Sequence, residues 1–147
     1  MIKTIIAKFE HETNLPIEVE DIANAIIAAG IQDEIHFVPV EADPSVIHGA
    51  FARFTYHKQA YGDPIFVTHI SYNSNVSIEQ KRVICCKEMI HIFDRDIERT
   101  DTEDEIPDFL DKLLGPLTTD DFGLADFMAA KDKMAVYQCL PLLFPKA

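Results

Sequence analysis

The chain has 147 residues and a net charge of −12, and 48% of its residues are hydrophobic. This length fits one domain, residues 1–147, with a core of its own. A strongly acidic surface repels phosphate, and no Lys/Arg cluster is present, so the composition excludes direct nucleic-acid binding. No apolar run approaches the roughly 20 residues that a membrane helix needs, so we expect no membrane partner.

Three cysteines are present: Cys85, Cys86 and Cys139. An odd number, with two adjacent, is not typical of a disulfide framework. We therefore expect buried free thiols in a reducing compartment, the cytoplasm. Lysines interrupt the apolar residues 1–9, which argues against a secretory signal peptide at this end of the chain.

The N-terminal half predicts a helix followed by three strands. Residues 1–13 fit either a helix or a strand. A helix is predicted over residues 16–30, with Asn14 as its cap, Pro16 in its first turn and Gly30 at its end. Alternating and β-branched residues then predict three strands: Ile35–Val40, Gly49–Tyr56 and Pro64–Tyr72.

A central helix is predicted to begin after Ser77. Ser77 and Gln80 have the spacing of a capping box. Apolar residues then recur at steps of three and four, which predicts one continuous buried face. That face consists of Val83, Cys86, Ile90, Phe93 and Ile97, and Cys85, Met89 and Ile92 widen it.

The sequence beyond this helix is acidic, with nine Asp and Glu between Asp94 and Asp111. Such a segment fits a solvated loop or a docking surface for a basic partner. A short helix, Asp108–Leu114, is predicted within and just after it.

A final helix is predicted to run to about Leu140, with Thr118 and Asp121 at its start. Pro141 is expected to break or kink this helix. The apolar residues 140–144 fit either the core or a dimer contact, so the oligomeric state is not predicted. The order of elements predicts an α+β fold with the helices packed on one side of a small sheet.

Three ionisable residues interrupt the apolar central helix: Lys87, Glu88 and His91. Lys87 and His91 are four residues apart and share a helix face, with Glu88 beside them. This is the spacing of the zinc motif H-E-x-x-H, with a lysine at the first histidine. The same stripe also fits the solvated side of an ordinary amphipathic helix.

Several short motifs, in this order, resemble the ImmA/IrrE-type zincin metallopeptidases. In that family a strand ending near I-x-x-N precedes the helix with H-E-x-x-H, and a later helix carries E-x-x-A-D and ends in L-L-M-P. The corresponding segments here are Ile70–Asn73, Lys87–His91, Asp132–Val136 and Leu142–Pro145. The resemblance covers about residues 14–145 and implies a zincin-like fold, with the sheet packed on the central helix.

The resemblance also implies roles for single residues. Glu88 corresponds to the general base, His91 to the second histidine ligand and Asp132 to the acidic third ligand. Lys87 replaces the first histidine ligand, and Val136 replaces the final Asp of E-x-x-A-D. An ammonium group has no lone pair, whereas a catalytic zinc needs about three protein ligands. We therefore expect no cofactor, and a salt bridge from Lys87 to Glu88 or Asp132.

The leading interpretation is a metal-less, pseudo-metallopeptidase domain that binds a protein or peptide or acts in regulation. The resemblance implies that an extended peptide pairs with the sheet edge above the central helix, and Gly49–Phe54 is the candidate edge. Family members act on, or beside, transcriptional regulators, so the resemblance implies a partner of that class.

Two alternatives remain open. The first is an active zinc-dependent metallopeptidase with an altered ligand set, in which His57 or His69 replaces the missing histidine. The second is a non-catalytic interaction protein that binds its partner through the acidic segment Asp94–Asp111. Metal content separates the first alternative from the leading interpretation, and salt-sensitive association would favour the second.

Overall fold

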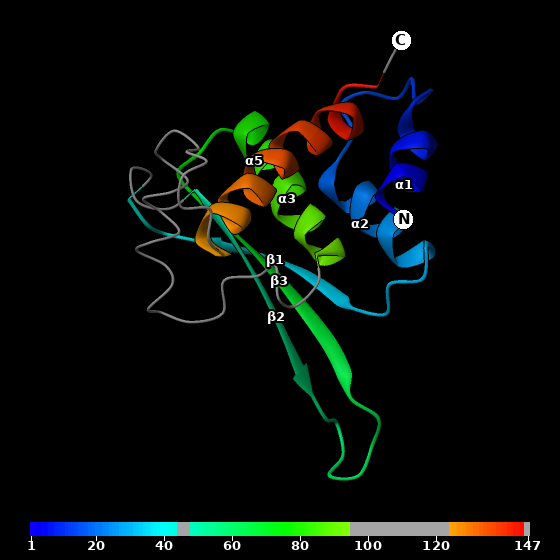
Figure 1. Ribbon diagram of the computed structural model, residues 1–147, viewed down its shortest axis with the longest axis vertical. Helices are drawn as coiled ribbons and strands as arrows, with labels where there is room; N and C mark the ends of the chain where they lie inside the picture. Colours follow the sequence, from blue (N-terminus) through cyan, green and yellow to red (C-terminus); the bar gives the residue numbers. More distant parts are fainter. Residues whose placement is uncertain (44–47, 95–123, 146–147) are drawn as a thin grey trace.

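A computed structural model describes residues 1–43, 48–94 and 124–145 of the chain (Figure 1). These residues form an α+β arrangement, as the sequence predicts, with a three-stranded sheet and four α-helices. The elements in chain order are α1 (Ile2–Phe9), α2 (Val19–Ala28), β1 (Glu34–Val40), β2 (Gly49–Tyr56), β3 (Ile65–Asn73), α3 (Ile78–Ile90), a short 3-10 helix η1 (His91–Phe93) and α5 (Leu124–Leu143).

The sheet has the strand order β1-β3-β2, with β1 parallel and β2 antiparallel to the central strand β3. All three strands lie within one residue of their predicted bounds. Ile70 at the centre of β3 pairs with Phe37 on one side and Phe51 on the other, and it is fully buried. This face of the sheet packs against the core that α3 lines, while the β2–β3 hairpin extends beyond the helices (Figure 1).

The first residues form a helix, α1, which buries Ile5 and Phe9 against the core. The end of α2 agrees with its prediction, because Gly30 follows the helix with φ +107°. That left-handed conformation is strained for other residues and is typical of a glycine just beyond a helix.

The start of α2 differs from its prediction. The helix begins at Val19 rather than at Pro16, so Asn14 is not its cap. Residues 16–18 reach the helix in a non-helical path that inserts Ile17 into the core, where it is buried. Glu18 is extended, and its carboxylate accepts hydrogen bonds of 2.7 and 3.2 Å from an arginine of α3. These tertiary contacts outweigh the local preference for an earlier start.

The central helix α3 begins as predicted. The Gln80 amide donates to Ser77 Oγ at 3.2 Å, and the Ser77 amide donates to Gln80 Oε1 at 3.1 Å, which completes the capping box. The α-helix ends at Ile90 and continues only as η1, so it is shorter than the predicted apolar face. Ile97, the last residue of that face, lies outside the described residues.

The predicted burial of the thiols is confirmed. Cys85, Cys86 and Cys139 are free and buried. Burial raises the pKa of the Cys85 thiol to about 12, so this thiol is neutral at physiological pH. The cysteines therefore act as small apolar side chains between α3 and its neighbours.

The last helix, α5, continues through Pro141, so Pro141 does not break the helix, and the alternative of a kink stays a prediction. Leu142 and Leu143 are buried, and the Phe144 amide donates to the Leu140 carbonyl at 2.8 Å. Packing of the two leucines offsets the hydrogen bond that proline cannot make. The apolar residues 140–144 thus lie partly in the core and partly at the surface, because Leu140 and Phe144 are exposed.

Several predictions fall outside the described residues. These are most of the acidic segment, the short helix Asp108–Leu114 and the start of the last helix at Thr118 and Asp121. Among the described residues, no helix combines the length and apolar content that crossing a membrane requires.

Candidate functional site

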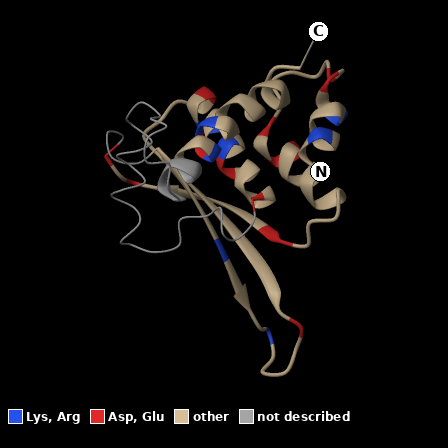
Figure 2. Ribbon diagram, in the orientation of Figure 1, with Lys and Arg blue, Asp and Glu red and all other residues tan. Residues whose placement is uncertain are grey.

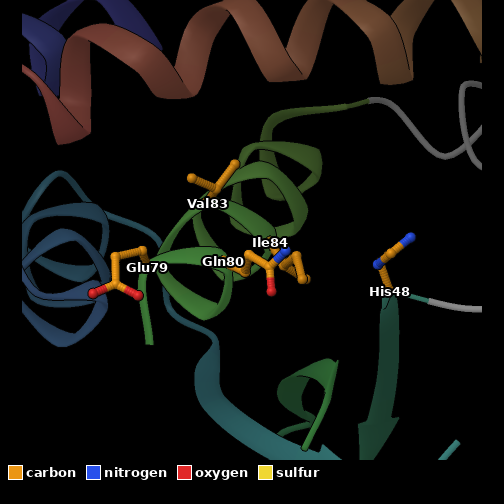
Figure 3. Close-up of a pocket in the computed structure, with 5 residues that line it drawn as sticks. All are labelled: His48, Glu79, Gln80, Val83 and Ile84. Carbon is orange, nitrogen blue, oxygen red and sulfur yellow. The ribbon is translucent and has the colours of Figure 1, made fainter. Parts of the chain in front are cut away.

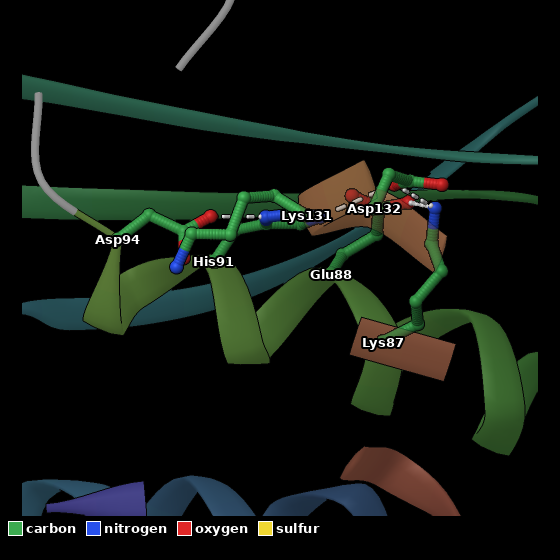
Figure 4. A network of polar contacts seen from close by, with 6 residues as sticks. All are labelled: Lys87, Glu88, His91, Asp94, Lys131 and Asp132. Atoms are coloured by element: carbon green, nitrogen blue, oxygen red, sulfur yellow. Dashed lines mark hydrogen bonds and ion pairs between the residues drawn. The ribbon is translucent and has the colours of Figure 1, made fainter. Parts of the chain in front are cut away.

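The candidate site lies where α5 packs along α3, and it contains the four residues that the sequence singles out (Figure 4). Lys87 and Glu88 come from the last turn of α3, His91 from η1 directly after it, and Asp132 from α5. One face of α5 has small buried side chains one and two turns after Asp132, at Ala135 and Cys139. Small side chains let two helices approach closely, which brings Asp132 to the polar side of α3.

Lys87 lies between the two carboxylates. Its Nζ atom is 2.8 Å from Glu88 Oε1 and 2.7 Å from Asp132 Oδ1. The three side chains are 21%, 6% and 13% exposed, respectively. The predicted salt bridge of Lys87 is therefore confirmed with both partners. The alternative of a solvated helix face is wrong for these residues, because α5 covers them.

Both ring nitrogens of His91 are hydrogen-bonded to carboxylates. Nε2 is 3.2 Å from Asp132 Oδ1, and Nδ1 is 2.5 Å from Asp94 Oδ2. Burial alone would lower the pKa of His91, but the hydrogen bonds to Asp132 and Asp94 outweigh it and raise the pKa to about 9. His91 is therefore an imidazolium at neutral pH, and both of its ring nitrogens donate hydrogen bonds.

Neighbouring charges also shift the pKa values of Lys87 and Asp132. Burial alone would lower the pKa of Lys87, but the charges of Glu88 and Asp132 outweigh it and raise that pKa. Burial alone would raise the pKa of Asp132, but the hydrogen bond from His91 and the charge of Lys87 lower it. Lys87 and Asp132 are therefore both ionised over the physiological pH range.

Lys131 completes the network through an ion pair with Asp94, in which Nζ and Oδ1 are 3.6 Å apart. We call the whole set the charge cluster. At neutral pH its cations and carboxylates are equal in number, so opposite charges compensate one another within it. The charge cluster consists of Lys87, Glu88, His91, Asp94, Lys131 and Asp132 (Figure 4).

Asp94 and Lys131 are cluster residues that were not assigned to the site from the sequence, although Asp94 falls on the same polar stripe as Lys87 and His91. Asp94 follows His91 by three residues, a spacing that places two side chains on one helical face. This spacing could have identified Asp94 as a partner. Lys131 carries no such signal, because its partner comes from a different helix.

The two spare histidines lie away from the charge cluster. His57 Nδ1 is 3.0 Å from the Gly62 carbonyl in the β2–β3 hairpin. His69 is next to Ile70 on β3, so its side chain points to the sheet face opposite α3, where it packs edge-on against Phe54. Within the described part of the chain, no group of three or more His, Cys, Asp or Glu could hold a metal ion.

The edge strand β2 begins directly beside the charge cluster. A Cβ atom built on Gly49 would collide with Ile84 Cγ2 and lie 3.2 Å from Glu88 Cγ. Two residues later, the rings of Phe51 and His91 are 6.3 Å apart between centroids. Among the described residues, β3 is the only strand that pairs with β2. The start of β2 therefore lies against α3, and the other edge of β2 pairs with no strand of the described residues.

A small cavity of about 300 Å³ adjoins the same end of β2 (Figure 3). Its lining includes His48, just before β2, and Val83 and Ile84 on α3. Glu79 and Gln80 form the rest of the wall. Most of the atoms exposed in this cavity are apolar, because the three polar residues contribute little polar surface to it. The cavity lies next to Gly49.

Gly49→Ala is expected to lower the free energy of unfolding by about 1–3 kcal/mol, because the added methyl group overpacks the contact between β2 and α3. Chemical denaturation measures the change. Gly62→Ala is the matched control, since its Cβ would meet only ordinary contacts at 3.5 Å or more. Equal stability of the two variants would contradict the close approach of β2 to Ile84.

Comparison of the chain with protein-family models finds no match, and neither a curated protein nor a solved structure matches it. The comparisons therefore assign no family. Inference about function rests on the geometry of the charge cluster and on the resemblance in the sequence.

Proposed function

We propose that this chain is a metal-less, zincin-like domain that binds a protein or peptide and does not hydrolyse it. The observation that carries the proposal is the position of Lys87 Nζ, 2.8 Å from Glu88 and 2.7 Å from Asp132. In the zincin pattern, these two carboxylates are the general base and a metal ligand. Here an ammonium group binds both of them.

The residues present do not fit a zinc ion. A ligand must offer a lone pair, which the ammonium of Lys87 lacks, so only His91 and Asp132 remain of the ligand pattern, fewer than the three protein ligands that a catalytic zinc needs. Together Lys87 and His91 carry two positive charges, the formal charge of Zn²⁺. We infer that they take over the structural role of the metal and hold α3 against α5 through Asp132.

The state of Glu88 supports a non-catalytic role. A general base must reach the proton it removes with a free carboxylate oxygen. The Glu88 side chain is 6% exposed, and its Oε1 atom is paired with Lys87. The carboxylate therefore serves to compensate a cation in this arrangement.

The edge of β2 supports peptide binding. An edge strand can pair with an extended peptide, and main-chain hydrogen bonds then supply the affinity. The predicted edge segment Gly49–Phe54 lies within β2, and its first residue packs against α3. We infer that a peptide adds to this edge, next to the cavity. A transcriptional regulator as its source is proposed from the resemblance alone.

The positions of the histidines favour this proposal over an active metallopeptidase with a substitute ligand. His69 faces away from α3, and His57 belongs to the extended hairpin. The alternative of binding through the acidic segment concerns residues that, apart from Asp94, lie outside the described ranges. Under that alternative, added salt would weaken partner binding, whereas main-chain pairing at β2 is less sensitive to salt.

The replacement Lys87→His tests the proposal, because it restores the H-E-x-x-H spacing beside Asp132. We expect this variant to bind about one zinc per chain and the wild-type chain to bind none, as measured by calorimetric titration. Zinc at 100-fold over its Kd should then stabilise the variant by about 2.7 kcal/mol.

Lys87→Gln is the matched control, since it removes the cation without adding an imidazole. Two results would count against the proposal: stoichiometric zinc in the wild-type chain, or zinc binding by Lys87→His no tighter than by Lys87→Gln.

A further inference from the structure

The outer side of α5 has a stripe of exposed apolar side chains. These residues recur at short helical steps on the side of α5 that faces away from the core. The buried side of the same turns carries Ala135, Cys139, Leu142 and Leu143. We call the exposed set the α5 apolar stripe: Met134, Val136, Tyr137, Leu140 and Phe144, which are 52%, 39%, 73%, 43% and 66% exposed.

The last turns of α5 therefore carry apolar side chains around most of their circumference, with Gln138 as a polar exception. Residues 134–145 contain no Asp, Glu, Lys or Arg (Figure 2). A helix that is apolar all round is normally buried all round, and contiguous exposed apolar side chains mark contact surfaces. The core of the chain covers one side of this helix. We therefore expect a second surface to cover the exposed side chains of the α5 apolar stripe.

A second copy of the chain can supply that surface. Two chains with a net charge of −12 repel each other, and this repulsion is weakest where they meet through a region free of carboxylates. The α5 apolar stripe is such a region.

The size of the stripe fits a small isologous interface. It spans about 15 Å of helix at a rise of 1.5 Å per residue. Large apolar side chains bury on the order of 150–250 Å² each, so the exposed parts of the stripe amount to roughly 500 Å² per copy. A symmetric pair would bury at most about 1,000 Å² in total, which is near the lower limit for specific association.

We propose that two copies of the chain associate through the α5 apolar stripe as an antiparallel, two-fold symmetric helix pair. Such a contact is self-complementary, because each copy contributes the same residues. Tyr137 and Leu140 lie at the middle of the stripe, next to the symmetry axis. The dimer is independent of the proposed function, since α5 meets the charge cluster with a different face.

Sedimentation velocity of the full chain over a range of concentrations tests the dimer. We expect wild-type particles of twice the 16.6 kDa chain mass at the upper concentrations. Tyr137→Glu places a carboxylate at the centre of the contact in both copies and should weaken dimerisation by about 100-fold or more. Tyr61→Glu is the matched control, because Tyr61 is fully exposed in the hairpin, and this variant should remain dimeric.

A cross-link provides a second readout that does not depend on a disruptive variant. The Leu140→Cys variant should form a disulfide-linked dimer in the presence of a mild thiol oxidant. The oxidant accepts the two electrons and two protons that the position-140 thiols of the two copies lose. The Tyr61→Cys variant should not form such a dimer, and the three native cysteines are buried.

Four results would overturn the proposal. The first is a wild-type chain that stays monomeric at every concentration, and the second is a monomeric chain that instead floats with phosphatidylcholine vesicles. The third is a dimer that Tyr137→Glu leaves intact or that Tyr61→Glu weakens equally. The fourth is cross-linking at position 61 but not at position 140.

Discussion

Replacing Lys87 with alanine is expected to lower the free energy of unfolding by about 3–5 kcal/mol, the usual effect of removing one partner of a buried ion pair. The variant leaves Glu88 and Asp132 facing each other with only His91 to compensate them. Both carboxylates are shielded from water, so the loss of the cation is not made good by hydration. Urea denaturation followed by circular dichroism measures the change.

Two further variants separate charge from packing. Lys87→Met keeps most of the side-chain stem and removes only the ammonium, so it should destabilise the chain nearly as much as Lys87→Ala. Lys3→Ala removes an exposed lysine of α1 and should change stability by less than about 0.5 kcal/mol. Near-neutral behaviour of Lys87→Ala would show that Lys87 is hydrated and that the charge cluster does not join α3 to α5.

Stability is expected to fall as the pH rises from about 6.5 to about 9, because His91 loses its proton over this range. Its pKa is raised from 6.5 to about 9 in the folded chain. A raised folded pKa stabilises the protein fully below the unfolded value, and this contribution is lost as the pH rises through the folded value. The shift corresponds to about 3 kcal/mol.

The neighbours of His91 define the rest of the pH profile. Asp132 and Asp94 accept its hydrogen bonds, Glu88 adds a further negative charge, and Lys87 shares Asp132. The pKa of Asp132 is lowered, so its contribution is present above its unfolded pKa and is lost as the pH falls through the folded value. The charge cluster should therefore be most stabilising between the acidic titration of Asp132 and about pH 6.5.

Denaturant midpoints measured from pH 5 to pH 10 test this profile. His91→Gln should remove most of the decline between pH 6.5 and pH 9, since glutamine does not titrate. His11→Gln replaces an exposed histidine and should leave the decline unchanged. A wild-type profile that is flat over this range, or one that His91→Gln leaves unaltered, would contradict the pairing of His91 with Asp132 and Asp94.

The strands and the start of the central helix could be predicted because their signals are local. Alternation in Ile35–Val40 and the Ser77 capping box each depend on neighbouring residues. The salt bridge of Lys87 with Asp132 could also be predicted, although it joins residues 45 positions apart. That expectation came from the motif resemblance together with the chemistry of an ammonium group.

The remaining features depend on tertiary packing, which no local pattern encodes. Ile17 occupies the core, so α2 starts later than Pro16 suggests. The buried leucines that follow Pro141 keep α5 helical where the local preference predicts a break. The position of Lys131 beside Asp94 likewise requires knowledge of how α5 lies on α3.

The metal content of the purified chain tests the central claim, that Lys87 and His91 occupy the place of a divalent cation. The chain is stripped with a chelator, incubated with excess zinc, desalted and then analysed for first-row metals. We expect far less than one metal per chain, because the cluster offers cations where a metal needs lone pairs. About one zinc per chain, lost in His91→Gln, would show that zinc displaces these cations and would contradict the claim.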